Sequence, residues 1–340
     1  MREIIFTCVT AGLLLCFVDP QMQTCFAQDA ATDSGQLSRR EKFKMLRQAH
    51  EASGDSDTAI TRPGDYTFSI KHDGLDRWYR VHVPASYSPS KPTPVLFAFH
   101  GGGGGMDIQA NDAYYGQISK SEQAGYIAVF PNGFSKLKSG MLATWNAGNC
   151  CGGARDKGSD DVGFVREIIM HLSGQLNVDA KRIFADGISN GGMMVYRLAC
   201  EMPDVFRAVA SVAGTDNTKV CSPKVPISIL HIHAKNDDTE LFDGGAGKNS
   251  SRVTDFVSVP DSIAKWVRLN GCNATPKRVF ENAGAYCDAY AQCRGGVEIK
   301  LCVTQTGGHS WPGGKKVRGD AQTSDALSAT DVIWEFFSTH

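Results

Sequence analysis

The sequence predicts an α/β fold in which a mostly parallel central sheet is flanked by helices. Residues 94–100 form an almost continuous apolar run, which is typical of a strand buried on both faces. Beyond this run, apolar segments of strand length alternate with segments of helical periodicity, an order that predicts right-handed crossovers between parallel strands. We expect an antiparallel strand pair at 66–70 and 78–83, strands at 94–100, 126–130, 182–185, 206–213, 227–233 and 297–305, and helices at 110–124, 161–176, 190–202, 262–270 and 331–337.

Length and composition fit one catalytic domain, which we place at residues 61–340. The chain has 340 residues, of which 42% are hydrophobic and 21% are charged, and this is enough apolar material for a large buried core. Its formal net charge of -1 gives no sign of the basic face that nucleic acid or an anionic membrane would require. The expected partner is therefore a small or oligomeric substrate, and the sequence leaves the oligomeric state open.

The N-terminus predicts export. Arg2 precedes an apolar stretch at 4–18 that has the length of a signal-peptide core and is short for a membrane span. Cys25-Phe26-Ala27 supplies small residues at the cleavage positions, so we expect a signal peptide at 1–27 and a leader or linker at 28–60. If the signal peptide is removed, the protein should be secreted or periplasmic without membrane attachment. The alternative is that the N-terminal segment stays uncleaved as a membrane anchor.

Cysteine usage supports the same compartment. Three of the 11 cysteines fall in the predicted signal, which leaves an even number, eight, as disulfide candidates. No C-x-x-C pair exists, so the spacing does not resemble a zinc site. Cys150 and Cys151 are adjacent, and we expect each to pair elsewhere because a bridge between neighbours strains the peptide. We expect a bridge between Cys200 and Cys221; the other candidates are Cys272, Cys287, Cys293 and Cys302.

The most informative motif is Gly187-Ile188-Ser189-Asn190-Gly191. It lies between a predicted strand and a predicted helix, where a nucleophilic serine must occupy a sharp turn flanked by glycines. The pattern alone also fits an unreactive Ser/Gly turn. Its position between strand and helix favours Ser189 as a nucleophile.

A glycine run provides a candidate oxyanion hole. His100 is followed by five glycines, residues 101–105, directly after a predicted strand. Glycines let backbone N–H groups approach a ligand oxygen, as in the HGGG-type loops of hydrolases. We expect the donors to be the amide of Asn190 and that of Gly102 or Gly103, assisted by the positive end of the following helix. A flexible glycine linker is the alternative.

The remaining catalytic candidates are His309 and Asp237. His309 lies in a glycine-rich segment, 307–314, after the last predicted strand. Triads of α/β hydrolases run serine, acid, histidine along the chain, so the acid must lie between Ser189 and His309 on a turn after a strand. Asp237 fits this place, with Asp238 and Glu240 as alternatives. Among the other histidines, we expect His100 to be structural or part of the oxyanion loop, and His231 and His233 to be packed and hydrogen bonded.

With these motifs in view, residues 64–340 resemble the secreted esterases grouped around poly(3-hydroxybutyrate) depolymerases and feruloyl or acetylxylan esterases, of the carbohydrate esterase family 1 type. The resemblance rests on the motifs at 145–148 with Cys150-Cys151, 160–164, 187–192 and 308–314. It implies the α/β-hydrolase fold and an acid four residues after His233, which is Asp237. The sequence departs from the family there, with Ala234-Lys235 in place of Gly-Thr and Glu240-Leu241 in place of Val-Pro.

The expected protein is a disulfide-stapled, secreted serine esterase that acts through an acyl-enzyme and needs no metal or organic cofactor. The resemblance implies hydroxyalkanoate oligomers, feruloyl esters or acetyl esters as substrates. Trp145 and Trp311 either line the substrate cleft or pack the loops that carry the site. A serine peptidase of the same fold and a non-catalytic binding protein are the alternative functions.

Overall fold

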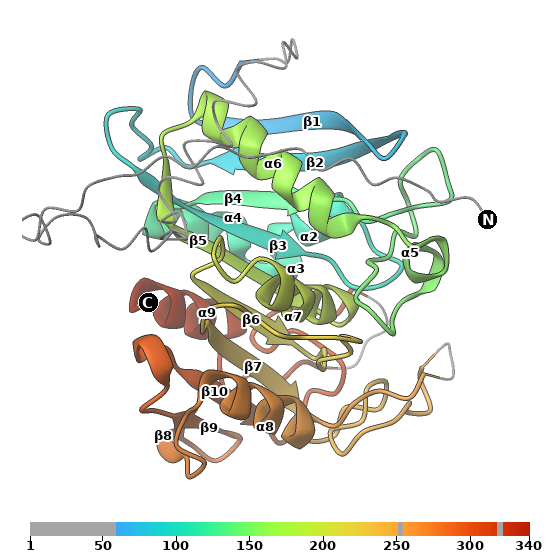
Figure 1. Ribbon diagram of the computed structural model, residues 1–340, viewed down its shortest axis with the longest axis vertical. Coiled ribbons are helices and arrows are strands. Elements are labelled where there is room, and N and C mark those ends of the chain that lie inside the picture. The colour runs from blue at the N-terminus through green and yellow to red at the C-terminus, as the bar shows by residue number, and fades with distance from the viewer. Residues whose placement is uncertain (1–58, 251–253, 318–321) are drawn as a thin grey trace, which may run out of the picture. The chain divides into compact units, whose positions relative to one another are not determined.

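The computed structural model describes residues 59–250, 254–317 and 322–340. The predicted signal peptide and nearly all of the predicted leader lie outside these residues. The described chain contains a ten-stranded sheet with the order β1-β2-β4-β3-β5-β6-β7-β10-β9-β8 (Figure 1). The strands are β1 Gly64–His72, β2 Leu75–Val83, β3 Thr93–Phe99, β4 Ile127–Pro131, β5 Val178–Ile188, β6 Ala208–Val212, β7 Ser228–Ala234, β8 Lys277–Glu281, β9 Ala285–Tyr290 and β10 Ile299–Thr304.

The centre of the sheet is parallel and its two sides are antiparallel. The strands from β4 through β3, β5, β6 and β7 to β10 pair in parallel, whereas β1, β2, β9 and β8 pair antiparallel. This confirms the predicted α/β fold. Strands β8 and β9 were not predicted; in β8 all five residues are exposed, and the two apolar ones, Val279 and Phe280, are adjacent and so do not alternate with polar residues.

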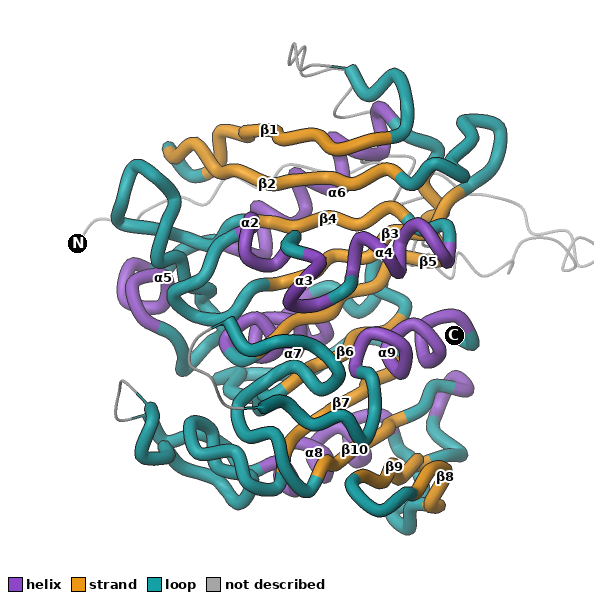
Figure 2. Tube along the Cα trace, turned by 180° about the vertical axis from the view of Figure 1, so that it is seen from behind, coloured by secondary structure: helices purple, strands orange, loops and turns teal. Residues whose placement is uncertain are grey.

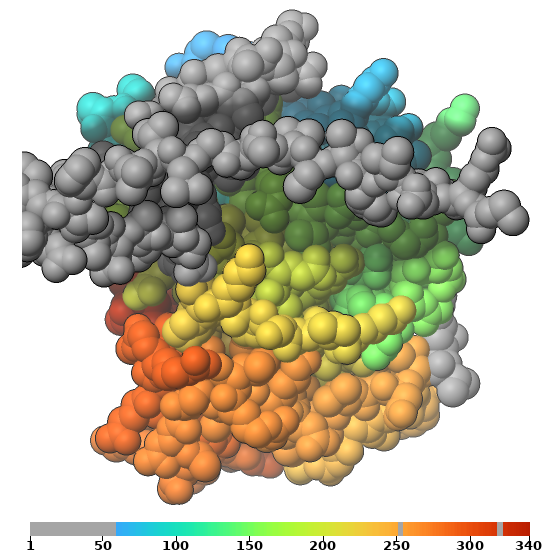
Figure 3. Space-filling model, viewed as in Figure 1, coloured from blue at the N-terminus to red at the C-terminus, as the bar shows by residue number. Residues whose placement is uncertain are grey.

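Helices cover both faces of the sheet. Helices α6 (Asp161–Gln175), α7 (Asn190–Glu201) and α8 (Val259–Asn270) lie on the face toward the viewer in Figure 1, and α8 belongs to the orange region of the space-filling view in Figure 3. Helices α3 (Asp112–Tyr115), α4 (Gln117–Ala124) and α9 (Ala329–Ser338) lie on the other face (Figure 2). Side chains alternate along β3: Phe97 belongs to the core under α6 and α7, and Ala98 to the core under α9. The continuous apolar run of β3 is thus explained by burial on both sides.

The helix expected at 110–124 is divided. Gly116 ends α3 and begins α4 with a left-handed backbone (φ 65°), which glycine adopts without steric cost. Two short helices, α2 (Met106–Gln109) and α5 (Gly152–Lys157), lie in loops where no helix was expected. The other predicted helices are present with small shifts at their ends.

Within the described residues, eight cysteines form four disulfides. Cys200–Cys221, the predicted bridge, ties the end of α7 to the loop after β6, and Cys287–Cys302 joins neighbouring strands β9 and β10. Cys272–Cys293 links the segments that follow α8 and β9. The expectation for Cys150 and Cys151 was wrong, because they are bonded to each other. The peptide between them is cis, which brings their Cα atoms to 3.1 Å, closer than the 3.8 Å of a trans peptide.

Candidate active site

Ser189 occupies a sharp turn between β5 and α7. Its backbone has φ 55° and ψ -126°, a conformation that a residue with a side chain rarely adopts and that is concentrated at functional sites. Its amide donates to the carbonyl of Val212 on β6, and its carbonyl accepts from the amide of Met193 on α7. The turn is therefore fixed on both sides, and Ser189 is half-buried at the carboxyl edge of the sheet.

The flanking glycines are required by close backbone approach. A Cβ on Gly187 would collide with the backbone of Gly191, and one on Gly191 would collide with the carbonyl of Phe99 on β3. Any side chain at these positions would push β5, α7 and β3 apart. This is the steric reason for the G-x-S-x-G spacing.

The glycine loop after β3 lies against the serine turn. A Cβ on Gly101 would contact Ser189 Cβ, and one on Gly102 would contact Asn190 Cβ, each at 3.5 Å. The Gly103 amide, however, donates to the Ala143 carbonyl at 2.8 Å. Because this amide is already engaged, Gly103 is disfavoured as the second oxyanion donor. Within the described residues, the Gly102 amide binds no protein acceptor. Gly102 and Asn190 are therefore the better pair of candidate oxyanion donors.

His100 and Trp145 hold this loop in place. His100 is fully buried; its Nδ1 donates to the Gly101 carbonyl at 2.8 Å and its Nε2 accepts from the Gly133 amide at 3.0 Å. Burial lowers the pKa of His100 to about 4, against the opposing effect of the Gly101 bond, so the ring is neutral. Trp145 Nε1 donates to the His100 carbonyl at 2.9 Å, and the Trp145 backbone exchanges two hydrogen bonds with the Asn190 side chain.

Both tryptophans that the sequence singled out are buried. Trp145 is 0% exposed and Trp311 is 1% exposed. Trp311 donates from Nε1 to Thr330 at 2.9 Å and packs edge-on against Tyr115. This burial favours the alternative in which both tryptophans pack the loops that carry the site. Sequence could not decide this, because glycine-rich loops can turn an aromatic ring inward or outward.

Asp237 and His309 are brought into contact from the loops after β7 and β10. These strands are parallel neighbours that end in register, with Ala234 opposite Thr304, so their loops leave the same edge of the sheet. His309 Nδ1 donates to Asp237 Oδ2 at 2.8 Å. Asp237 Oδ1 also accepts from the amides of Thr239 and Glu240, at 2.8 and 3.0 Å.

The charges of this pair reinforce one another. Burial alone would raise the pKa of Asp237, but hydrogen bonds from His233 and His309 outweigh it and hold the pKa well below its ordinary value. Burial alone would lower the pKa of His309, yet the hydrogen bond and charge of Asp237, with the charges of Glu240 and Asp238, raise it. Asp237 is thus ionised at neutral pH and favours a protonated imidazole.

A directed hydrogen-bond chain lies behind Asp237. His233 Nε2 faces two acceptors, the Glu240 carbonyl at 3.0 Å and Asp237 Oδ2 at 3.3 Å, so this nitrogen carries a proton. In a neutral His233 ring, Nδ1 then accepts from His231 Nε2 (3.1 Å), and His231 Nδ1 accepts from the Tyr196 hydroxyl (2.8 Å). Burial and the neighbouring His233 lower the pKa of His231, which keeps it neutral. Every donor in this chain points toward Asp237.

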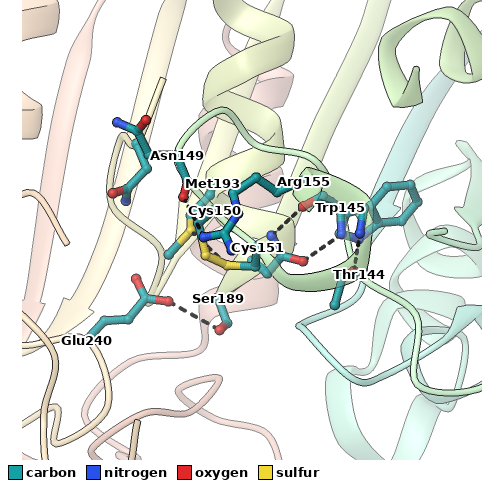
Figure 4. Close-up of a disulfide and its surroundings, with 12 residues drawn as sticks. Thr144, Trp145, Asn149, Cys150, Cys151, Arg155, Ser189, Met193 and Glu240 are labelled. Carbon is teal, nitrogen blue, oxygen red and sulfur yellow. Dashed lines mark hydrogen bonds between the residues drawn. A yellow bond between two sulfur atoms is a disulfide. The ribbon is translucent and has the colours of Figure 1, made fainter. Parts of the chain in front are cut away.

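The two alternative acids lie elsewhere. Asp238 Oδ2 accepts from the Asn249 side chain at 2.7 Å, and in the described part of the chain Asp238 forms no hydrogen bond with His309. Glu240 instead contacts the nucleophile candidate, since Ser189 Oγ donates to Glu240 Oε1 at 3.3 Å (Figure 4). Within the described residues, no hydrogen bond joins Ser189 Oγ to His309. From the sequence, Glu240 was predicted only as an alternative acid; the feature that sets it apart is that it stands where the family has Val.

A parallel sheet that presents a serine on a tight strand–helix turn, with a His–Asp pair on neighbouring loops, is an α/β-hydrolase fold. Residues 74–306 match the family described as "Putative esterase", and the chain belongs to that family as a feruloyl esterase-like α/β hydrolase.

Two curated relatives and one solved structure illustrate the similarity. Feruloyl esterase B of Piromyces equi is 30% identical over 246 residues, which cover 69% of this chain; the chain spans 43% of the length of that relative. Probable feruloyl esterase C of Aspergillus niger is 32% identical over 270 residues, which cover 78% of this chain and 85% of the relative. The acetyl xylan esterase structure from Aspergillus awamori has a TM-score of 0.56 at 12% identity, over 81% of this chain and all of that one, and supports the fold.

None of the helices in the described ranges is long and apolar enough to cross a membrane.

Proposed function

We propose that this protein is a secreted serine ester hydrolase in which Ser189, His309 and Asp237 form the catalytic triad. The observation that carries the proposal is the 2.8 Å bond from His309 Nδ1 to Asp237 Oδ2 at the sheet edge where Ser189 is presented on a strained turn. This bond fixes the imidazole tautomer, leaving Nε2 as the free base.

In the proposed reaction, Ser189 Oγ attacks the ester carbonyl carbon while its proton passes to His309 Nε2. The resulting oxyanion receives hydrogen bonds from the amides of Gly102 and Asn190. His309 then gives its proton to the departing alcohol, and an acyl-enzyme remains on Ser189. Water, deprotonated by His309, attacks this acyl group and releases the acid. Asp237 stays ionised throughout and stabilises the protonated imidazole.

We propose that the substrates are soluble carboxylic esters. They are feruloyl or acetyl esters, which the names of the relatives favour, and short hydroxyalkanoate oligomers. The N-terminal sequence supports export, with removal of residues 1–27. N-terminal sequencing of the exported protein should therefore begin at Gln28, and retention of Met1 would contradict the proposed signal peptide.

The test is hydrolysis of p-nitrophenyl acetate, p-nitrophenyl butyrate, methyl ferulate and a 3-hydroxybutyrate oligomer. The wild type is compared with Ser189→Ala and with Ser90→Ala, which changes an exposed serine on a loop. We expect turnover by the wild type and by Ser90→Ala and none by Ser189→Ala. Equal turnover by all three folded proteins would refute the serine mechanism. A p-nitroanilide in the same panel separates ester from amide hydrolysis.

A further inference from the structure

Glu240 is a buried carboxyl group in contact with the proposed nucleophile. Its side chain is 2% exposed. Oε1 accepts from Ser189 Oγ at 3.3 Å, and Oε2 accepts from the Thr215 amide at 3.3 Å. Figure 4 shows the side chains of Ser189 and Glu240 pointing toward one another. The reaction described above gives Glu240 no role.

The loop after β7 holds Glu240 firmly in this position. Its amide donates to Asp237 Oδ1 at 3.0 Å, and its carbonyl accepts from His233 Nε2 at 3.0 Å. The residue that contacts the nucleophile is therefore anchored to the carboxylate that orients His309. A change of charge on Glu240 therefore acts directly on the Ser189 hydroxyl that its side chain contacts.

The hydroxyl of Ser189 has one proton and can donate it to one acceptor at a time. In the structure the acceptor is Glu240, and attack on an ester requires that the proton go to His309. An ionised carboxylate is a strong acceptor and competes with the imidazole. A protonated Glu240 reverses the bond: because the Thr215 amide occupies Oε2, the carboxyl proton sits on Oε1 and donates to Ser189 Oγ, whose own proton is then available to His309.

The groups that face Glu240 come from several elements. His309 lies on the loop after β10, and His233 lies on β7. Asp237 lies on the loop after β7, which also carries Glu240, and the Thr215 amide follows β6. Asp216, next to Thr215, is paired with Lys265 of α8 at 2.8 Å. Burial, partly opposed by His309 and His233 and assisted by Asp237, raises the pKa of Glu240 to about 7. The carboxyl group thus changes its charge near neutral pH.

We propose that Glu240 positions the nucleophile: its ionised form holds the Ser189 hydroxyl away from His309, and its protonated form releases the hydroxyl for attack. This inference rests on the proposed serine mechanism. Glu240 neither gains nor loses a proton during turnover, and the proton of Ser189 still passes to His309.

The consequence is a bell-shaped dependence of kcat/KM on pH. The reactive form needs neutral His309 together with protonated Glu240, and these two groups titrate as a coupled pair. Below the working range His309 is protonated, and above it Glu240 is ionised. We expect kcat/KM to fall about ten- to hundredfold on the alkaline side, the effect of a hydrogen bond to a charged group.

The experiment measures kcat/KM for p-nitrophenyl acetate from pH 5 to about pH 9, corrected for spontaneous hydrolysis, in the wild type, Glu240→Gln and Asp243→Asn. In Glu240→Gln the side-chain amide offers both a donor and an acceptor, as a protonated carboxyl does. Asp243→Asn makes the same chemical change at an exposed residue of the same loop, 3.3 Å from Lys235. We expect the alkaline limb to disappear in Glu240→Gln alone, and its acidic limb to move little, because Glu240 already carries no charge on the acidic side.

Three results would overturn the inference. One is a wild-type profile that rises to a plateau with no alkaline limb. The second is an alkaline limb that persists in Glu240→Gln. The third is a loss of at least a hundredfold at every pH in folded Glu240→Gln, which would make Glu240 a proton acceptor in the reaction. If Glu240→Gln does not fold, Glu240→Met takes its place, and an alkaline limb that persists in Glu240→Met would overturn the inference. If Ser189→Ala remains as active as the wild type, the proposed function itself has failed.

Discussion

His233 and His309 donate to the same carboxylate oxygen. His233 Nε2 lies 3.3 Å and His309 Nδ1 lies 2.8 Å from Asp237 Oδ2, and His233 is in turn the end of the buried chain from Tyr196. The carboxylate is therefore held from the solvent side by the proposed base and from the core side by a buried histidine. This arrangement explains how a buried aspartate stays ionised.

Removal of His233 should weaken catalysis through Asp237. For His233→Ala we expect kcat to fall about tenfold or more, the effect of losing one hydrogen bond to a charged group, with partial recovery in His233→Gln, which keeps a donor. The pKa of Asp237 should rise, so the loss should grow toward acidic pH. The measurement is kcat of the His233 variants as a function of pH. The control is His72→Ala, which changes a histidine of β1. Equal losses for the Ala and Gln variants at all pH values would contradict it.

Asp237→Asn should cost about 10⁴-fold in kcat, because an amide can stabilise the wrong imidazole tautomer and cannot stabilise the imidazolium. Asp238→Asn, which alters the neighbouring carboxylate bonded to Asn249, should change kcat by less than about tenfold. Kinetics of the two purified variants under the same conditions provide the measurement. The assignment of the acid would be wrong if Asp238→Asn were the more damaging change.

Trp145→Phe should lower kcat and leave KM nearly unchanged. The indole donates to the carbonyl of His100, so its loss loosens the glycine loop that carries the Gly102 amide, while the buried ring touches no bulk solvent. We expect a decrease in kcat of about tenfold, less than for the removal of an oxyanion donor. A rise in KM with unchanged kcat would instead indicate that the ring binds substrate.

Asp186 should make the stability of the fold fall with rising pH. It is 1% exposed on β5, both of its oxygens accept from Gln117 Nε2 at 2.9 Å, and burial raises its pKa to about 8 despite this bond. Because its pKa in the unfolded chain is about 3.9, the folded state alone holds this proton between roughly pH 4 and pH 8. Stability from this group is therefore lost as the pH rises through that range.

Asp186→Asn removes this dependence. Urea unfolding with intact disulfides should show that the free energy of unfolding of the variant, relative to wild type, is higher at pH 8 than at pH 5. A difference that is the same at both pH values would show that Asp186 does not titrate in this range.

The parts of the site that sequence could predict are those fixed by local sterics and by topology. Ser189 is identifiable because a tight strand–helix turn excludes side chains at Gly187 and Gly191. The contact between Asp237 and His309 follows from chain order, since parallel neighbouring strands deliver their loops to one edge of the sheet.

The parts that sequence could not predict depend on how loops fold back. The burial of Trp145 and Trp311 and the bond from Ser189 to Glu240 depend on loop paths that no periodicity encodes. The bridge between Cys150 and Cys151 depends on the local backbone path of two adjacent residues. The exposed strand β8 lacks the alternation by which a strand is recognised.

The most direct test of the central claim is to trap the acyl-enzyme. Mixing the protein with p-nitrophenyl acetate and quenching in acid should give a burst of p-nitrophenol and one acetyl group on the peptide that contains Ser189, detected by mass spectrometry. Ser189→Ala should show neither. Hydrolysis without an acyl group on Ser189, or an adduct that persists in Ser189→Ala, would contradict the account.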